Sequence, residues 1–210
     1  MNPFPVILSA PSGGGKTTIA RELLRRRTDL GYSVSCTTRP PRLGEVEARD
    51  YYFLSPAAFE RKREAGEFAE SAQVHGNMYG TLRSEVERVL RSGKHVVMDI
   101  DVQGAQQFTR SFPESVTIFV LPPSAEVLLE RLRLRQSESK DQLTKRLQSA
   151  LQELQFVDLY QYVVENDDLE KAVHRVSAIV DAEVVSRERV AGLRHQVSQL
   201  VQRLEAEIQS

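Results

Sequence analysis

The segment from residue 6 to residue 27 constrains the fold more than any other part of this 210-residue chain. An apolar run from Val6 to Ala10 has the length of a buried strand, and Pro11-Ser12-Gly13-Gly14-Gly15 follows it as a turn-forming sequence. Thr17 to Arg27 then carries apolar residues at three- and four-residue spacing, which is typical of a helix. The segment therefore predicts a strand, a glycine-rich loop and a helix in direct succession.

This loop has the composition of a phosphate-binding site. It matches the Walker A pattern, except that Ala10 stands where a glycine is usual. Glycines let the backbone turn several N–H groups toward one anion, and the helix N-terminus adds partial positive charge. Lys16 would bind the β- and γ-phosphates of ATP, and the Thr17 hydroxyl would ligate Mg²⁺. A glycine turn without a ligand is the alternative, which the strand–loop–helix order disfavours. We predict these ATP-binding residues: Ala10, Pro11, Ser12, Gly13, Gly14, Gly15, Lys16, Thr17 and Thr18.

Two more apolar runs, Val96 to Ile100 and Val116 to Leu121, are typical of buried strands. Each is followed by a helical pattern, and the second of these runs from Ser124, the predicted N-cap, to Arg135. Strands that alternate with helices predict an α/β fold with a parallel sheet covered on both faces, as in P-loop NTPases. We expect a single domain whose core spans about residues 1–32 and 82–186.

Three segments depart from this alternation. Residues 33–81 are polar and rich in turns, with short strand patterns at 33–36, 50–53 and 68–74, and predict a small, mostly antiparallel lobe inserted into the core. Residues 136–146 begin with a polar gap between helices and suit a short helical lid. Residues 187–210 repeat apolar side chains at three- and four-residue spacing, which predicts an amphipathic helix. That helix packs on the core or pairs with a second copy, so the chain is a monomer or a homodimer.

Composition excludes several other classes of protein. A net charge of −1 gives no basis for binding nucleic acid. The single cysteine, Cys36, rules out an intrachain disulfide and a thiolate zinc site. No stretch approaches the ~20 apolar residues of a membrane span, and the first apolar run lacks the basic region of a signal peptide. We expect a cytoplasmic protein without a membrane partner.

A series of later motifs points to one family. After the loop come Ser35-Cys36-Thr37-Thr38-Arg39-Pro40-Pro41-Arg42-Leu43-Gly44-Glu45, Asp50-Tyr51, Glu70, Gly76-Asn77-Met78-Tyr79-Gly80-Thr81, Asp99-Ile100-Asp101-Val102-Gln103-Gly104, Arg131, Arg135, Arg146 and Asn166-Asp167-Asp168. In order and approximate spacing they resemble the guanylate kinase family over nearly all of residues 4–182. The resemblance implies direct in-line transfer of the γ-phosphoryl group of ATP to GMP with Mg²⁺, giving GDP and ADP. Three positions depart from the family pattern: Ala10, Ala48 and Gln136, each where a glycine is common.

The acceptor phosphate has candidate ligands in the inserted lobe. Arg39 and Arg42 flank the rigid Pro40-Pro41 pair, and two guanidinium groups on a stiff backbone suit bidentate binding of a phosphate. Tyr51 and Tyr79 offer hydroxyl donors to the same group. An exposed basic turn is the alternative, and the residues alone do not decide between the two.

Guanine needs acceptors for its N1–H and N2–H₂ donors and a donor for O6. The resemblance gives the carboxylate role to Glu70 and Asp101, and the hydroxyl role to Ser35 and Thr81. Adenine lacks that pair of donors, so AMP would leave buried carboxylates unpaired. Surface acids are the alternative, but Asp101 follows a predicted parallel strand at the end where ligands of such sheets bind.

Catalysis would rest on alignment and charge neutralisation, because a phosphate acceptor is already ionised and needs no general base. We predict five catalytic residues: Lys16, Arg39, Arg131, Arg135 and Arg146. Paired charges along a helix face are the alternative for the last three. The resemblance places Asn166 and Asp167 near the adenine of ATP. Asp99 supports Mg²⁺ or caps the following helix, and both roles remain open at this point.

Two other functions compete with this interpretation. The first is a related P-loop kinase that phosphorylates another acceptor, which the pair of Glu70 and Asp101 disfavours. The second is a non-catalytic guanylate kinase-like interaction module. Such a module has no need of a phosphate loop, and Gly15, Lys16 and Thr17 are intact here.

Overall fold

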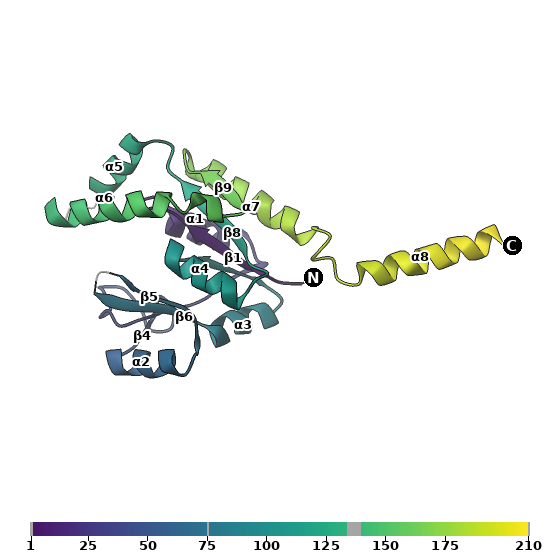
Figure 1. The fold of residues 1–210 in the computed structure, drawn as a ribbon, viewed down its shortest axis with the longest axis horizontal. Coiled ribbons are helices and arrows are strands. Elements are labelled where there is room, and N and C mark those ends of the chain that lie inside the picture. The colour runs from purple at the N-terminus through teal and green to yellow at the C-terminus, as the bar shows by residue number, and fades with distance from the viewer. Residues whose placement is uncertain (1, 75, 134–139, 210) are drawn as a thin grey trace.

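The computed structural model describes residues 2–74, 76–133 and 140–209. Its main sheet has five parallel strands in the order β2-β7-β1-β8-β9 (Figure 1). The strands are β1 (Pro5–Ser9), β2 (Leu30–Tyr32), β7 (His95–Asp99), β8 (Val116–Leu121) and β9 (Tyr162–Glu165). The prediction of a parallel sheet is confirmed, with the phosphate loop at the carboxyl end of its central strand.

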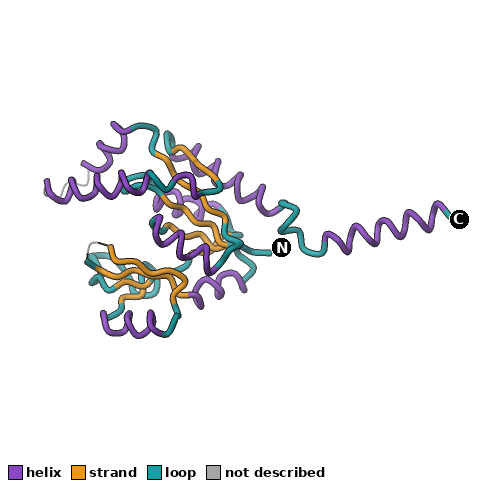
Figure 2. The backbone as a smooth tube through the Cα atoms, viewed as in Figure 1, coloured by secondary structure: helices purple, strands orange, loops and turns teal. Residues whose placement is uncertain are grey.

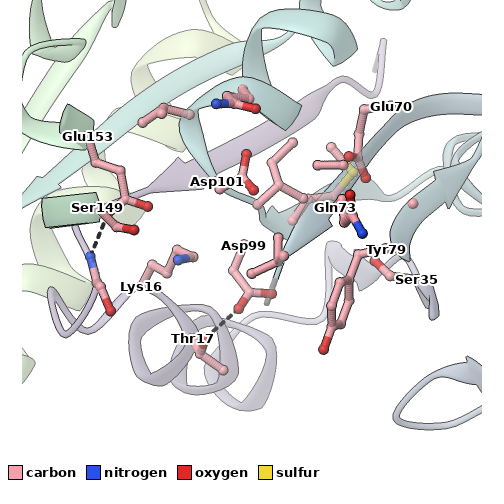
Figure 3. Close-up of a pocket in the computed structure, with 18 of the residues that line it drawn as sticks. Lys16, Thr17, Ser35, Glu70, Gln73, Tyr79, Asp99, Asp101, Ser149 and Glu153 are labelled. Atoms are coloured by element: carbon pink, nitrogen blue, oxygen red, sulfur yellow. Dashed lines mark hydrogen bonds between the residues drawn. The ribbon is translucent and has the colours of Figure 1, made fainter. Parts of the chain in front are cut away.

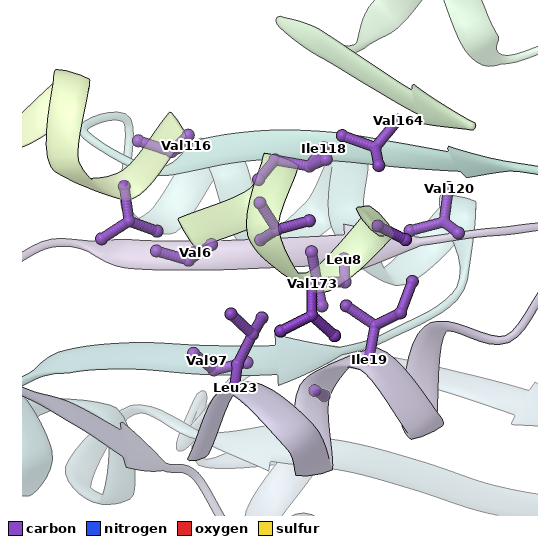
Figure 4. Close-up of a cluster of buried hydrophobic side chains, with 14 of the residues drawn as sticks. Val6, Leu8, Ile19, Leu23, Val97, Val116, Ile118, Val120, Val164 and Val173 are labelled. Atoms are coloured by element: carbon purple, nitrogen blue, oxygen red, sulfur yellow. The ribbon is translucent and has the colours of Figure 1, made fainter. Parts of the chain in front are cut away.

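Helices cover both faces of this sheet. On one face, α1 (Lys16–Arg26) and α7 (Leu169–Val184) pack against strand residues such as Leu8, with Ile19 and Val173 in the same apolar cluster (Figure 4). On the other face, α3 (Arg83–Arg91) and α4 (Val102–Ser111) pack against a second cluster that includes Ile7 and Phe108. Successive residues of β1 thus enter opposite clusters, which is why this strand is apolar throughout.

A smaller sheet, in the order β4-β3-β6-β5, lies beside the main one. Its strands are β3 (Cys36–Thr37), β4 (Tyr52–Phe53), β5 (Phe68–Val74) and β6 (Asn77–Leu82). β6 runs antiparallel to β3 and β5, and only the pairing of β3 with β4 is parallel. Helix α2 (Pro56–Glu64) covers it through Phe59, whose ring stacks on Phe68 beside the fully buried Cys36. The mostly antiparallel lobe is therefore confirmed.

One predicted strand is wrong. Residues 33–36 do not form a single strand, because the chain leaves the main sheet after Tyr32 and enters the smaller sheet at Cys36. Residues 33–35 instead connect the two sheets, with Ser33 and Ser35 on the wall of the cleft between them.

Helices α5 (Ala125–Arg133) and α6 (Lys140–Leu154) pack together through Leu128, Leu132 and Ala150. A short turn of 3₁₀ helix, Val157–Leu159, follows them. The α5–α6 pair and the smaller sheet project from the main sheet in the same direction (Figures 1 and 2). Arg135 and the first residues of the predicted lid, 136–139, lie outside the described residues.

The C-terminal helix α8 (Leu193–Ile208) extends away from the rest of the molecule (Figure 1). The predicted amphipathic helix is confirmed, but the expectation that it packs on the core is wrong, since none of its described residues is buried. Gly192, in the left-handed conformation at φ 70°, begins the helix in this outward direction. Exposed apolar side chains along it include Val197, Leu200 and Leu204.

No helix in the described part of the chain combines the length and the apolar character that crossing a membrane requires.

Candidate active site

A cleft of about 720 Å³ lies between the two sheets and α6 (Figure 3). Residues from three parts of the chain line it. The main sheet and the phosphate loop contribute Ser12, Lys16, Thr17, Asp99 and Asp101; the smaller sheet and its connection contribute Ser35, Tyr51, Glu70 and Tyr79; and α6 contributes Arg146, Ser149 and Glu153. The fold thus brings residues predicted for ATP and residues predicted for GMP to one space.

The backbone of the phosphate loop has the shape that its glycines allow. Gly13 and Gly15 adopt φ values of 86° and 96°, which residues with a side chain rarely adopt. The loop closes with Gly14 N–H donating to the Pro11 carbonyl at 2.7 Å, and α1 begins at Lys16. Asn166, the residue after β9, supports the loop through its side-chain amide, which donates to the Gly14 carbonyl at 2.9 Å.

Ala10, the first departure from the family pattern, is accommodated by packing. Its side chain is fully buried within the main apolar cluster. A Cβ atom at Gly14 would lie 2.7 Å from the Ala10 Cβ, so the missing side chain at position 14 leaves room for the methyl group at position 10.

Thr17 and Asp99 form the group predicted to support Mg²⁺. The Thr17 hydroxyl donates to Asp99 Oδ2 at 2.5 Å (Figure 3), and the Tyr32 hydroxyl donates to Oδ1 at 3.2 Å. Burial and the nearby Asp99 carboxylate raise the pKa of Tyr32, which keeps it a donor. The alternative role of Asp99 as a helix cap is wrong, because Asp101 is the N-cap of α4.

These oxygens suit a hard cation. Mg²⁺ accepts one or two protein oxygen ligands and completes its shell with water and substrate phosphate. Among the described residues, no three His, Cys, Asp or Glu side chains gather as a metal-binding group. Thr17 and Asp99 supply two oxygen atoms of the kind that such a cation binds.

The residues predicted for guanine surround one buried carboxylate. Glu70 is 6% exposed, and its Oε1 accepts a hydrogen bond from the Thr81 hydroxyl at 2.6 Å. Burial raises the pKa of Glu70 to about 7, and the Asp101 charge adds to the shift. Asp101 accepts the Gly104 N–H at 2.7 Å as the N-cap of α4, and the Ser35 and Thr81 hydroxyls lie 3.5 Å apart.

Arg39 and Arg42 are not among the described residues that line the cleft. Arg39 borders it through Tyr79, whose hydroxyl accepts the Nε–H at 3.3 Å, and its guanidinium lies 5.5 Å from the centre of the Tyr51 ring. The side chain of Arg39 is 11% exposed, which excludes a solvated basic turn at that position. Arg42 is exposed.

Ala48, the second departure, adopts φ 61°, the left-handed conformation that a glycine adopts easily. Its N–H donates to the Tyr51 carbonyl at 2.9 Å, so the turn before Tyr51 forms with alanine in place. Gln136, the third departure, lies outside the described residues.

Of the remaining predicted site residues, some lie at the cleft and others lie away from it. Arg146 lines the cleft. Arg131 donates through Nη2 to the Asn166 carbonyl at 3.1 Å, and its Nη1 is buried without a partner among the described residues. Asp167 is exposed and pairs with Arg175 at 3.2 Å, and the neighbouring backbone N–H of Asp168 lowers its pKa. Thr18 is exposed on α1.

Two acidic residues of the site were missed by the sequence analysis. Glu153 of α6 accepts the backbone N–H of Ser12 at 2.8 Å (Figure 3), and Glu45 binds the Arg39 guanidinium at 2.8 and 3.0 Å. Glu153 lies 141 residues from its partner, so no local pattern signals the contact. Glu45 lies in the same motif as Arg39, and their opposite charges at a spacing of six residues were the available signal.

Comparisons with known proteins agree with this geometry. The family described as guanylate kinase matches residues 2–183. The guanylate kinase of Caldanaerobacter subterraneus subsp. tengcongensis is 45% identical over 178 residues, covering 85% of this chain and 86% of that protein. The guanylate kinase of Paramagnetospirillum magneticum is 46% identical over 196 residues, covering 93% and 92%. The crystal structure of guanylate kinase from Anaplasma phagocytophilum superimposes with a TM-score of 0.77 at 36% identity, covering 94% of each chain. The chain belongs to the guanylate kinase family.

Proposed function

We propose that this protein is a guanylate kinase that transfers the γ-phosphoryl group of ATP to GMP. The family, the relatives and the fold support the activity. The observation that carries the choice of acceptor is the pair of carboxylates Glu70 and Asp101, which line the same cleft as the phosphate loop, with the buried Thr81 hydroxyl donating to Glu70.

In this proposal the N–H groups of the phosphate loop and Lys16 bind the phosphates of ATP, while Asn166 and Asp167 lie toward its adenine. Thr17 and Asp99 would hold Mg²⁺, which neutralises charge on the β- and γ-phosphates. An ionised oxygen of the GMP phosphate forms a new bond to the γ-phosphorus of ATP. The bond from that phosphorus to the β–γ bridging oxygen breaks at the same time, and the oxygen leaves with ADP, so no proton moves in this step. Charge on the transferring group is spread over five side chains: Lys16, Arg39, Arg131, Arg135 and Arg146.

Residues 33–81 serve in this proposal as the GMP-binding lobe, with Arg39, Arg42, Tyr51 and Tyr79 at the phosphate. Glu70 and Asp101 accept the guanine N–H donors, and Ser35 and Thr81 contact O6. AMP offers no equivalent donors and leaves the buried carboxylates unpaired. Residues 136–146 act as the lid that brings Arg146 to the phosphates.

A panel of acceptors tests the proposal directly. With ATP and Mg²⁺, a coupled assay compares GMP, AMP, dTMP and ribose 1,5-bisphosphate. We expect the catalytic efficiency with GMP to exceed that with AMP by a factor on the order of 10⁴, since a site built for hydrogen bonds rejects analogues that lack them. Comparable rates with AMP or dTMP would contradict the assignment of guanine.

The same proposal places the protein in the cytoplasm, as a monomer or as a homodimer paired through α8. The exposed apolar side chains of α8 support pairing. Sedimentation of the full chain and of a chain ending at Arg187 distinguishes the two states. A mass that falls by half after truncation supports the homodimer, and an unchanged monomer mass supports the monomer.

A further inference from the structure

Glu45 binds one end of the Arg39 guanidinium. Its two carboxylate oxygens accept Nη1–H at 3.0 Å and Nη2–H at 2.8 Å, and the side chains are only 19% and 11% exposed. The second Nη1–H donates to the Pro40 carbonyl at 2.8 Å. The end of the guanidinium and its Nη1 side are therefore occupied by groups of the lobe itself.

An arginine has five N–H donors in a fixed plane. After Glu45 and Pro40, the donors that remain are Nε–H and the second Nη2–H, which lie side by side on one edge. Nε–H is directed to the Tyr79 hydroxyl at 3.3 Å, and Tyr79 lines the cleft. This edge lies beside the cleft, where a phosphate oxygen would share the Nε–H with Tyr79 or replace the Tyr79 hydroxyl as its acceptor, and two parallel N–H donors suit two oxygens of a phosphate.

The backbone in turn fixes Glu45. Its Oε2 accepts the Arg42 N–H at 2.7 Å, and its own N–H donates to the Arg42 carbonyl at 3.0 Å. Gly44 permits this tight turn with φ 86°. Arg39 and the Arg42 amide together hold the pKa of Glu45 below its usual range, so the carboxylate stays ionised.

We propose that Glu45 is a positioning residue, which holds Arg39 by one end so that its Nε–Nη2 edge faces the phosphate of GMP. This inference rests on the proposed function, in which GMP is the acceptor. A carboxylate that merely competed with GMP for Arg39 would weaken binding, and its removal would tighten it. A positioning carboxylate does the opposite, because a guanidinium already held in place loses less conformational freedom on binding. Whether removal of the Glu45 carboxylate weakens or tightens GMP binding therefore decides between the two roles.

The test compares Glu45→Gln with Glu47→Gln. Glu47 is a matched control in the same lobe, because it accepts the Phe53 N–H at 3.0 Å and, in the described part of the chain, forms no hydrogen bond with Arg39. We expect Glu45→Gln to raise the KM for GMP by roughly 10-fold to 100-fold, as for other misplaced binding groups, and to leave the KM for ATP unchanged. Glu47→Gln should leave both constants near those of the parent.

Two further measurements separate positioning from loss of folding. Guanosine has no phosphate, so its inhibition constant should be the same in Glu45→Gln and the parent. In an Arg39→Lys background, which removes the guanidinium, Glu45→Gln should change the KM for GMP by less than about twofold.

Three results would overturn the inference: tighter or unchanged GMP binding by Glu45→Gln, equal losses for guanosine and GMP, or a full effect in the Arg39→Lys background. The proposed function fails by another result, a parent enzyme that does not phosphorylate GMP. The two failures are therefore distinguishable.

Discussion

The two regions that we propose bind phosphate are built in different ways. In the phosphate loop the donors are backbone N–H groups, and their direction follows from the Gly13 and Gly15 conformations and the junction of β1 with α1. In the smaller sheet the donors are the side chains of Arg39 and Tyr79, and their direction depends on Glu45. A backbone site is sensitive to any added Cβ atom, whereas a side-chain site is sensitive to its neighbouring side chains.

The two regions also share one feature, since a carboxylate of the chain contacts each of them. Glu153 accepts the Ser12 N–H of the loop, and Glu45 binds Arg39. Glu153 belongs to α6, which also carries Arg146, so this hydrogen bond ties that helix to the loop. The contact of Glu45 with Arg39 lies within residues 39–45, between β3 and β4, whereas the contact at the phosphate loop joins two segments that are far apart in the sequence.

The largest effect is expected at the charged side chain of the loop. Lys16→Ala should lower kcat by about 10²–10³-fold, because it removes a donor aimed at the charge that develops in the transition state. GMP affinity, measured by calorimetry, should remain that of the parent. Lys94→Ala, an exposed lysine outside the cleft, is the control. Unchanged turnover in Lys16→Ala would contradict the enzymatic role.

A pair of glycine substitutions tests the difference between a backbone site and a side-chain site. Gly15 and Gly44 both have positive φ values, 96° and 86°. A Cβ atom at Gly15 would lie 2.4 Å from Asn166 Nδ2, whereas nothing lies within 4 Å of one at Gly44. We expect Gly15→Ala to reduce kcat/KM for ATP by about 10²-fold. Gly44→Ala should cost only about 1 kcal/mol of unfolding free energy. Equal losses of activity would remove the distinction drawn between the regions.

Glu70→Gln tests the base site of the lobe. The amide keeps an acceptor for the Thr81 hydroxyl but presents N–H₂ to guanine donors, so kcat/KM for GMP should fall roughly 10-fold to 150-fold. The nucleotide-free variant should melt at a higher temperature than the parent at pH 8. In the parent, folding raises the pKa of this carboxyl to about 7, so the stability it contributes is present below its usual pKa and is lost as the pH rises through 7. A lower melting temperature would show that the charge of Glu70 does not oppose folding.

A related effect is expected on the pH dependence of base binding. The ionised Glu70 presents two acceptor oxygens to the guanine donors, whereas protonation turns one of them into a donor, so guanosine affinity should fall by up to about tenfold per pH unit below pH 7. Guanosine is the ligand of choice, because the phosphate of GMP also titrates in this range. Binding to the Glu70→Gln variant should be independent of pH between 5 and 8. A flat profile in the parent would exclude Glu70 as the titrating ligand.

The elements that were predicted correctly are those that a local pattern of residues specifies. The loop and the strands β1, β7 and β8 were found because continuous apolar runs between turns specify buried strands. β2 was missed because it has only three residues, one of them Gly31, and its direction is set by pairing with β7. β9 was missed at the other edge of the sheet, where two of its four residues are exposed.

The site residues divide in the same way, into those that a local motif reveals and those that only tertiary packing brings into contact. Glu70, Thr81 and Asp101 were recognised through motifs, and the fold brings them together. The contact of Glu153 with Ser12 depends on how α6 packs, and the contact of Glu45 with Arg39 depends on side-chain conformation within a loop. The outward direction of α8 depends on the turn before Gly192, although its amphipathic pattern was plain. Tertiary packing decides these features, and no pattern of neighbouring residues encodes it.

Cys36 allows the opening of the smaller sheet to be measured separately from changes at the phosphate loop. It is the only cysteine of the chain and is fully buried inside the smaller sheet, where burial raises the pKa of its thiol to about 12. A thiol reagent can reach it only when that sheet opens. The rate of labelling in the folded enzyme therefore reports the opening of the smaller sheet alone, and protection by GMP but not by ATP would measure how tightly each substrate closes it. The single thiol of the chain therefore allows the opening of the smaller sheet to be measured separately from the phosphate loop.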